Sequence, residues 1–206
     1  LGVGLITVLI GVPLFVNLVL VEGALDGGLT LMRLTAAVPV GAVAGGWLTS
    51  RIGLRATAVP GMLLAAVCFA GLQGWDRELS EVLRSVPQIV GGFGFGLAIA
   101  PLGAAVLQRV QEANRAAVSA WLTLSRVTGM LVGAALLTST GLGRFYARAG
   151  SVSFDSPEFA ALVSQAQVTT FREVFIAGAV VMLAASAVAW FIGHGRAEAD
   201  ADPWWT

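Results

Sequence analysis

Long uninterrupted runs of apolar residues alternate with short polar segments along the whole chain. Six runs are close to the roughly 20 residues that a helix needs to cross the hydrocarbon core of a bilayer. The predicted spans are residues 1–21, 29–50, 56–73, 87–108, 117–140 and 174–193. Only Arg33 and Arg126 of the 24 charged residues lie within them. This segregation of charge predicts six transmembrane helices.

Continuous apolar runs favour helices over strands, because a membrane β-barrel shows short segments of alternating polarity instead. A helix also satisfies its own backbone hydrogen bonds, and this is required in the bilayer core because lipid tails offer no hydrogen-bond partners. We therefore predict an all-α, polytopic membrane protein with one six-helix bundle over residues 1–193 and a polar C-terminal tail over residues 194–206. In the long connection between residues 141 and 173, residues 157–167 form either a short interfacial helix or a plain loop.

The composition excludes several classes of protein. Of the 206 residues, 57% are hydrophobic and 12% are charged, and the net charge is zero, which excludes a disordered chain and a basic nucleic-acid binder. A single cysteine, Cys68, excludes an internal disulfide. An intramembrane enzyme needs a nucleophile with a base, or a metal cluster, at depth, and the lone His194 does not provide one. We expect no enzyme activity, no metal and no cofactor.

Arg126 is the main candidate for a functional residue inside the membrane. It lies about nine residues into its predicted span, roughly 13 Å deep at 1.5 Å per residue. An arginine at this depth is costly and normally faces a cavity or a partner. The predicted spans hold no acid, so the partner is a backbone carbonyl, a substrate or a residue outside this chain. The alternative is a structural arginine bonded to hydroxyls such as Ser125 or Thr128.

Arg33 and Asn17 are the other candidates for a substrate path, and they lie near one membrane face. Arg33 is close to the start of its span, so its long side chain can reach the interface or pair with Glu22 or Asp26. Asn17 either hydrogen-bonds a neighbouring helix or faces the path. The structural roles and the functional ones both remain open at this point.

Pairs of glycines four residues apart recur in three spans. Small residues at this spacing let membrane helices approach closely, and they also allow helices to rock against one another. The candidate packing residues are Gly41, Gly45, Gly92, Gly96, Gly129 and Gly133.

Three stretches together resemble the major facilitator superfamily of transporters. Residues 45–55 are similar to its loop motif, G-x-L-x-D-R-x-G-x-R, with Ser50 in the place of the acid. Residues 91–101 are a glycine-rich stretch that ends in proline. Residues 117–136 are similar to the S-G-x(4)-S-R-x-x-G-x-x-x-G span of the multidrug proton antiporter branch, with Ala120 replacing the first glycine. The residues that match the loop motif are Gly46, Arg51, Gly53 and Arg55.

The resemblance implies the C-terminal half of a larger transporter in the bacterial inner membrane. It implies inverted three-helix repeats over residues 1–73 and 87–193, with the turn at residues 51–55 and the C-terminus in the cytoplasm. The arginines alone give no orientation, since each face would carry five of them. The implied partners are the lipid bilayer, an N-terminal helical bundle of the same protein, a small-molecule substrate and protons.

The implied activity is proton-coupled efflux of drug-like compounds by alternating access, with the substrate bound between two bundles. Because the predicted spans hold no acid, the proton-carrying carboxylate is expected in the other half. The alternative is a stand-alone six-helix scaffold or sensor without transport activity, for example a homodimer.

Overall fold

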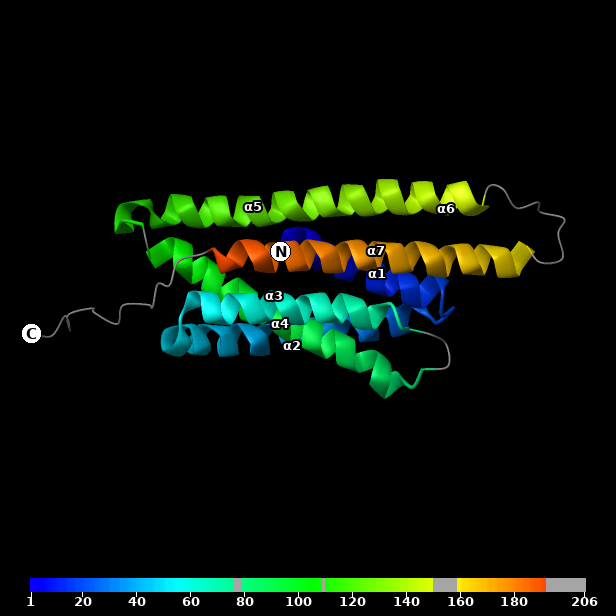
Figure 1. Ribbon diagram of the computed structural model, residues 1–206, viewed down its shortest axis with the longest axis horizontal. Helices are drawn as coiled ribbons and strands as arrows, with labels where there is room; N and C mark the ends of the chain where they lie inside the picture. The colour runs from blue at the N-terminus through cyan, green and yellow to red at the C-terminus, as the bar shows by residue number, and fades with distance from the viewer. Residues whose placement is uncertain (76–78, 109, 150–158, 192–206) are drawn as a thin grey trace, which may run out of the picture.

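The computed structural model describes residues 1–75, 79–108, 110–149 and 159–191, and apart from short turns they are helical (Figure 1). The predicted all-α fold class is confirmed. The tail over residues 194–206, predicted to be cytoplasmic, lies outside the described residues, as do residues 157 and 158 of the predicted interfacial helix.

The described residues form six helical rods, with a 3₁₀ turn η1 (Glu112–Asn114) before the fifth. In the fifth rod, α5 passes through the π-helical turn η2 into α6. Every rod except the 17-residue α1 is long and apolar enough to cross a membrane. The rods are α1 (Gly2–Leu18), α2 (Ala24–Ile52), α3 (Leu54–Leu72), α4 (Glu81–Gln108), α5 (Arg115–Leu136) with η2 (Leu137–Gly141) and α6 (Leu142–Ala149), and α7 (Phe159–Trp190).

Several helices extend well beyond the apolar stretches that predict them. The helix α4 begins at Glu81, the fifth rod continues to Ala149, and α7 begins at Phe159. Hydropathy marks only the length of helix that lipid can cover, whereas backbone hydrogen bonding continues into polar residues. The long connection expected after residue 140 is therefore helical over much of its length. Residues 159–167 are the first turns of α7, not a separate interfacial helix.

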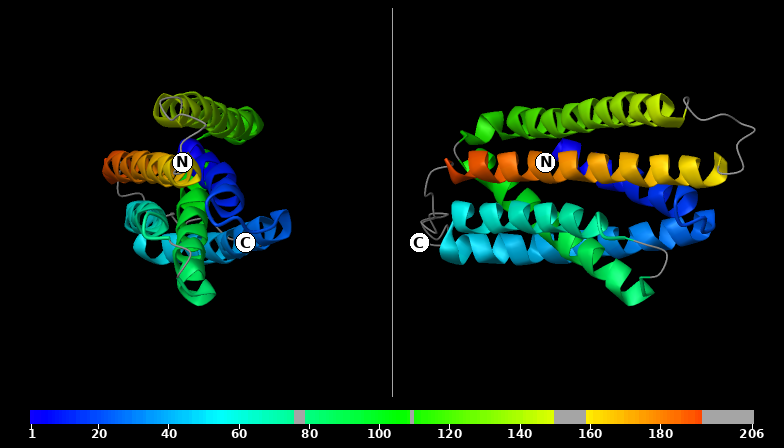
Figure 2. Two further views of the ribbon diagram at one scale, coloured as in Figure 1. Left: turned by 90° about the vertical axis from the view of Figure 1, so that its right-hand side faces the viewer. Right: turned by 45° about the vertical axis from the view of Figure 1, so that its right-hand side comes forward.

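The helices pack in a pattern that repeats. The helix α4 packs against α2 and α3, and α1 packs in the same way against α5 and α7. The helix α3 contacts α7, α1 contacts α2, and α4 contacts α5. Exchanging α1 with α4, α2 with α5 and α3 with α7 leaves this set of contacts unchanged. Consecutive rods are antiparallel, so the two three-helix units run in opposite directions (Figures 1 and 2).

The core lies where α1, α3, α4 and α7 meet. The large side chains that are fully buried there are Phe15, Phe69, Phe95, Phe175 and Met182. The helices α2 and α5 are mostly exposed, and Figure 2 shows the fifth rod at the edge of the bundle. Their outer faces are thus free to contact lipid or another helical bundle.

The helices α2 and α4 touch backbone to backbone. A Cβ atom built on Gly41 would overlap the carbonyl oxygen of Phe93, and one built on Gly45 would lie 2.8 Å from the carbonyl oxygen of Leu97. From the other side, Cβ atoms on Gly92 and Gly96 would overlap backbone carbonyls of α2. Side chains at these positions would force the helices apart.

The crossing of α5 and α1 is looser at one of its two glycines. A Cβ atom on Gly133 would lie 2.9 Å from the Cα of Val3, whereas one on Gly129 would make an ordinary contact of 3.5 Å with the Cα of Gly2. Gly133 is thus the tighter of these two glycines, and from the other side a Cβ atom on Gly2 of α1 would overlap the carbonyl oxygen of Arg126.

Candidate functional site

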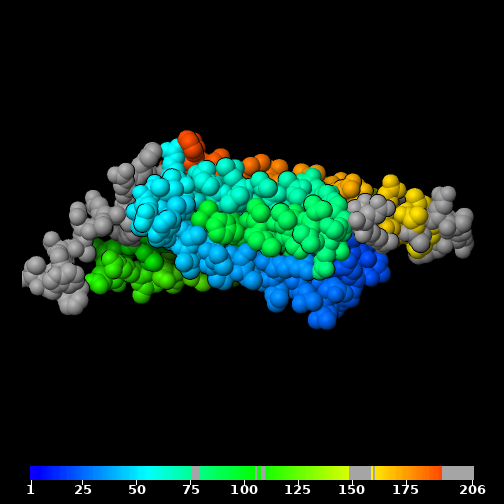
Figure 3. Space-filling model, turned by 90° about the horizontal axis from the view of Figure 1, so that it is seen from below, coloured from blue at the N-terminus to red at the C-terminus, as the bar shows by residue number. Residues whose placement is uncertain are grey.

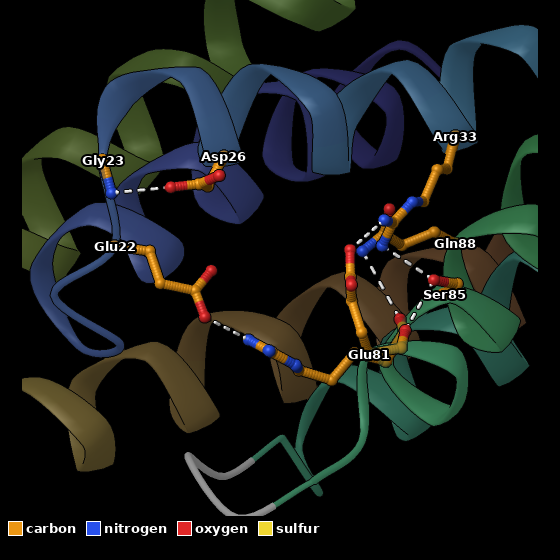
Figure 4. A network of polar contacts seen from close by, with 8 residues as sticks. Glu22, Gly23, Asp26, Arg33, Glu81, Ser85 and Gln88 are labelled. Atoms are coloured by element: carbon orange, nitrogen blue, oxygen red, sulfur yellow. Dashed lines mark hydrogen bonds and ion pairs between the residues drawn. The ribbon is translucent and has the colours of Figure 1, made fainter.

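Polar side chains gather at the end of the bundle where α1 and α3 end and α2 and α4 begin (Figure 4). We call this group the polar cluster. The turn after α1, the first turns of α2 and the first turns of α4 supply its members. They are Glu22, Asp26, Arg33, Glu81, Arg84, Ser85 and Gln88.

Two arginine–glutamate pairs join α4 to its neighbours within the polar cluster. Arg33 of α2 forms an ion pair with Glu81, and its Nη1 donates a 2.8 Å hydrogen bond to Ser85 Oγ. Arg84 Nη1 donates a 2.7 Å hydrogen bond to Glu22 Oε1. The predicted pairing of Arg33 with Glu22 or Asp26 is therefore wrong. The predicted spans leave Glu81 and Arg84 outside the helices, whereas α4 begins at Glu81 and brings both of them to the cluster.

Asp26 has a different partner. Its Oδ2 accepts a 3.1 Å hydrogen bond from the backbone N–H of Gly23, the residue before α2. A carboxylate in the first turn also interacts favourably with the helix dipole. Asp26 therefore caps α2 and leaves both arginines to the glutamates.

A cavity of about 310 Å³ opens among these charged groups. Its walls also include Val16, Leu29 and Thr30, and Trp75 lies beside the start of α4. Trp75 is 3% exposed and packs edge-on against Phe15, with ring centroids 5.8 Å apart. Within the described residues, three buried polar atoms at this end have no hydrogen-bond partner: Trp75 Nε1, Arg84 Nε and Gln88 Oε1.

Asn17 and Arg126 lie outside this cavity. Asn17 is exposed on α1. If Gly27 carried a Cβ atom, that atom would lie 3.0 Å from Asn17 Oδ1, so the amide of Asn17 packs against the first turn of α2. Arg126 is exposed on α5, a helix that contributes nothing to the cavity wall. Of the predicted substrate-path residues, the structure places only Arg33 in the cavity wall.

A hydroxyl expected to bond Arg126 in a structural role has another partner. Ser125 Oγ donates a 2.8 Å hydrogen bond to the carbonyl oxygen of Trp121 on its own helix. Among the described residues, the Arg126 side chain forms no ion pair. It is thus presented on an open face of the bundle.

A second ionic cluster joins α6 to α7, and the hydropathy pattern did not predict it. Arg144 and Arg148 both bond the carboxylate of Glu173, at 2.8 and 2.6 Å, and Arg148 also donates to Thr170 Oγ1 at 3.1 Å. The spacing of the two arginines, four residues apart, was the available signal, because it places them on one face of a helix.

The predicted loop motif forms the tight turn between α2 and α3. Gly53 has a φ of 90°, a conformation that favours glycine, and it ends one helix and starts the next. The Arg51 guanidinium lies 4.5 Å from the Trp47 ring centroid, and that of Arg55 lies 3.5 Å from the Trp190 centroid. Arg55 thus ties the turn to the end of α7. Gly46 faces open space.

Known proteins similar to this chain are mycobacterial transporters, although no protein-family model matches it. It is 32% identical over 220 aligned positions to a triacylglyceride transporter of Mycobacterium tuberculosis, covering 97% of this chain and 42% of that protein. A triacylglyceride transporter of Mycobacteroides abscessus is 35% identical over 167 positions, covering 76% of this chain and 32% of that protein. The chain is homologous to these proteins and spans less than half of their length.

Proposed function

We propose that this chain is the C-terminal half of a membrane transporter that moves neutral lipids of the triacylglyceride class by alternating access. The observation that carries the proposal is the similarity to triacylglyceride transporters over 97% of the chain. The two oppositely directed three-helix units support it, because inverted repeats of this kind build transporters that rock around a central site.

The second bundle would dock against the exposed faces of α2 and α5. Arg126 projects from α5, so a carboxylate of that bundle or the substrate would be its partner. We further propose that residues 1–193 act as one bundle, with the turn at residues 51–55 and the tail over residues 194–206 in the cytoplasm. The polar cluster then faces the outer side of the membrane.

Proton coupling would depend on the other half of the protein. The carboxylates on α4 and α7, Glu81 and Glu173, are each paired with arginine. An arginine beside a carboxylate stabilises its charged form and makes it a poor proton carrier near neutral pH. We therefore place the titrating carboxylate in the N-terminal bundle.

A second candidate function is proton-coupled efflux of drug-like compounds. It is favoured by residues 125–133, which follow the S-R-x-x-G-x-x-x-G pattern of the multidrug antiporter branch. Both candidates use the same alternating-access movement and differ in the substrate.

The test is transport by the full-length protein reconstituted into vesicles. Labelled triolein should move from these vesicles to acceptor vesicles faster than from protein-free ones, and an imposed proton gradient should change the rate. Ethidium uptake measured on the same vesicles tests the second candidate. Transport of neither compound, together with a stable homodimer of this chain alone, would favour the scaffold or sensor alternative.

A further inference from the structure

We infer that the polar cavity and an apolar groove beside it form one two-part binding site for an acylglycerol. The ester head would occupy the cavity, and one acyl chain would occupy the groove. This inference rests on the proposed lipid transport and adds where, and by which groups, the lipid is bound.

Two residues of the cavity wall carry buried hydrogen-bond donors that have no acceptor among the described residues. Trp75 is only 3% exposed, and Trp75 Nε1 and Arg84 Nε have no partner among the described residues. Both residues line the cavity. A buried donor without an acceptor costs free energy, and a ligand oxygen that reaches it after a small side-chain adjustment would remove this cost. The site therefore favours a ligand that carries acceptor oxygens.

The charges of the described wall residues disfavour an anionic ligand. Among the described residues, the wall holds three carboxylates, from Glu22, Asp26 and Glu81, against the two guanidinium groups of Arg33 and Arg84. Both arginines are already paired with glutamates. A fatty acid carboxylate or a phosphate would therefore meet a net negative wall, whereas an ester carbonyl accepts hydrogen bonds without adding charge.

The size of the cavity fits the head of a glyceride and not the whole lipid. Its volume of about 310 Å³ is at the lower end for small-molecule sites. The three long acyl chains of a triacylglyceride must therefore extend out of the cavity, and at least one of them needs an apolar surface to lie on.

The groove provides that path. It has a volume of about 610 Å³ and an almost entirely apolar wall, to which α2, α3 and α4 contribute. Figure 3 shows the face of the molecule on which α4 lies between α3 and α2. Arg33 lines both the cavity and the groove, so the two spaces meet at this residue. From Met32 to Val40 the groove follows α2 for about 12 Å at 1.5 Å per residue, the length of a substantial part of an acyl chain.

The experiment is equilibrium binding of radiolabelled triolein to the full-length protein purified in detergent. Trp75→Phe removes the unpartnered N–H and keeps an aromatic ring, and Ala36→Trp fills the groove from α2. Trp190→Phe and Val188→Trp, at exposed positions of α7 outside the cavity and the groove, are the matched controls. Triacetin, which has the ester head without long chains, and octanoate serve as competitors.

We expect Trp75→Phe and Ala36→Trp each to weaken triolein binding by about tenfold, the effect of one lost hydrogen bond or a blocked contact. The controls should bind as the unsubstituted protein does, and triacetin should compete better than octanoate.

Unchanged binding in both variants would overturn this inference and leave lipid transport standing. A melting temperature lowered by Ala36→Trp, with normal binding in Trp75→Phe, would show that the groove is an interface with the other bundle and would also overturn it. Absence of triolein binding by the unsubstituted protein would instead overturn the proposed substrate class and this site with it.

Discussion

Arg84, in the first turn of α4, donates a 2.7 Å hydrogen bond to Glu22, which lies 62 residues earlier in the turn after α1. Their side chains are 16% and 33% exposed. At this burial, removing one partner leaves the other charge only partly solvated and without its counter-charge. The pair therefore helps to hold the two antiparallel units together at the end of the bundle that carries the cavity.

We expect Glu22→Ala to lower the free energy of unfolding by about 2 kcal/mol, the contribution of a hydrogen bond between charged groups. Thermal unfolding in detergent measures this loss. Glu112→Ala, at an exposed carboxylate in η1, is the control and should have little effect. In a double-mutant cycle, Glu22→Ala with Arg84→Ala should cost less than the sum of the single substitutions. Strict additivity would show that the pair contributes nothing.

Gly41→Ala should separate α2 from α4. Its Cβ would overlap the carbonyl oxygen of Phe93, and backbone cannot move aside as a flexible side chain can. Overpacking of this kind costs about 1–3 kcal/mol. The control is Gly46→Ala on the same helix, where a Cβ meets nothing within 4 Å and alanine has the higher helix propensity. Equal melting temperatures for the two variants would contradict the observed contact.

Arg126→Ala in the full-length protein should reduce transport by at least about tenfold, equivalent to 1.4 kcal/mol. The melting temperature should change little, because the side chain is exposed on α5 and the described residues offer it no ion pair. Thr123→Ala, whose hydroxyl donates to the carbonyl oxygen of Ser119 on its own helix, is the control. Unchanged transport with unchanged pH dependence would reduce Arg126 to a scaffold residue.

Glu173→Ala should loosen α6 from α7. The carboxylate bonds both Arg144 and Arg148, whose side chains are 60% and 35% exposed, so solvent screening limits the loss to about 1 kcal/mol. Hydrogen exchange of the amides in residues 142–149 should become faster. Arg172→Ala, at the exposed neighbouring position, should leave exchange unchanged. Equal exchange in both variants would show that other contacts hold α6.

The sequence by itself determined that this is an all-α membrane protein. An apolar run of about 20 residues has one stable solution in lipid, a helix, because the backbone must satisfy its own hydrogen bonds there. Glycine spacing in α2 and α4 likewise indicated close helix contact, and both Gly41 and Gly96 lie where the two backbones touch. Helix formation and glycine spacing depend on the residues of one short segment, so the sequence alone predicts them.

Only the tertiary structure decided which charged residues meet. Arg33 pairs with Glu81, 48 residues away, rather than with the nearby Glu22 or Asp26. This choice depends on the start of α4 extending past its apolar stretch and on the angle at which α4 crosses α2. The cavity beside Trp75 arises in the same way, from four helix ends brought to one side of the bundle. Hydropathy records the affinity of each residue for lipid and carries no information on how helices rotate and cross, so these contacts could not be read from the sequence.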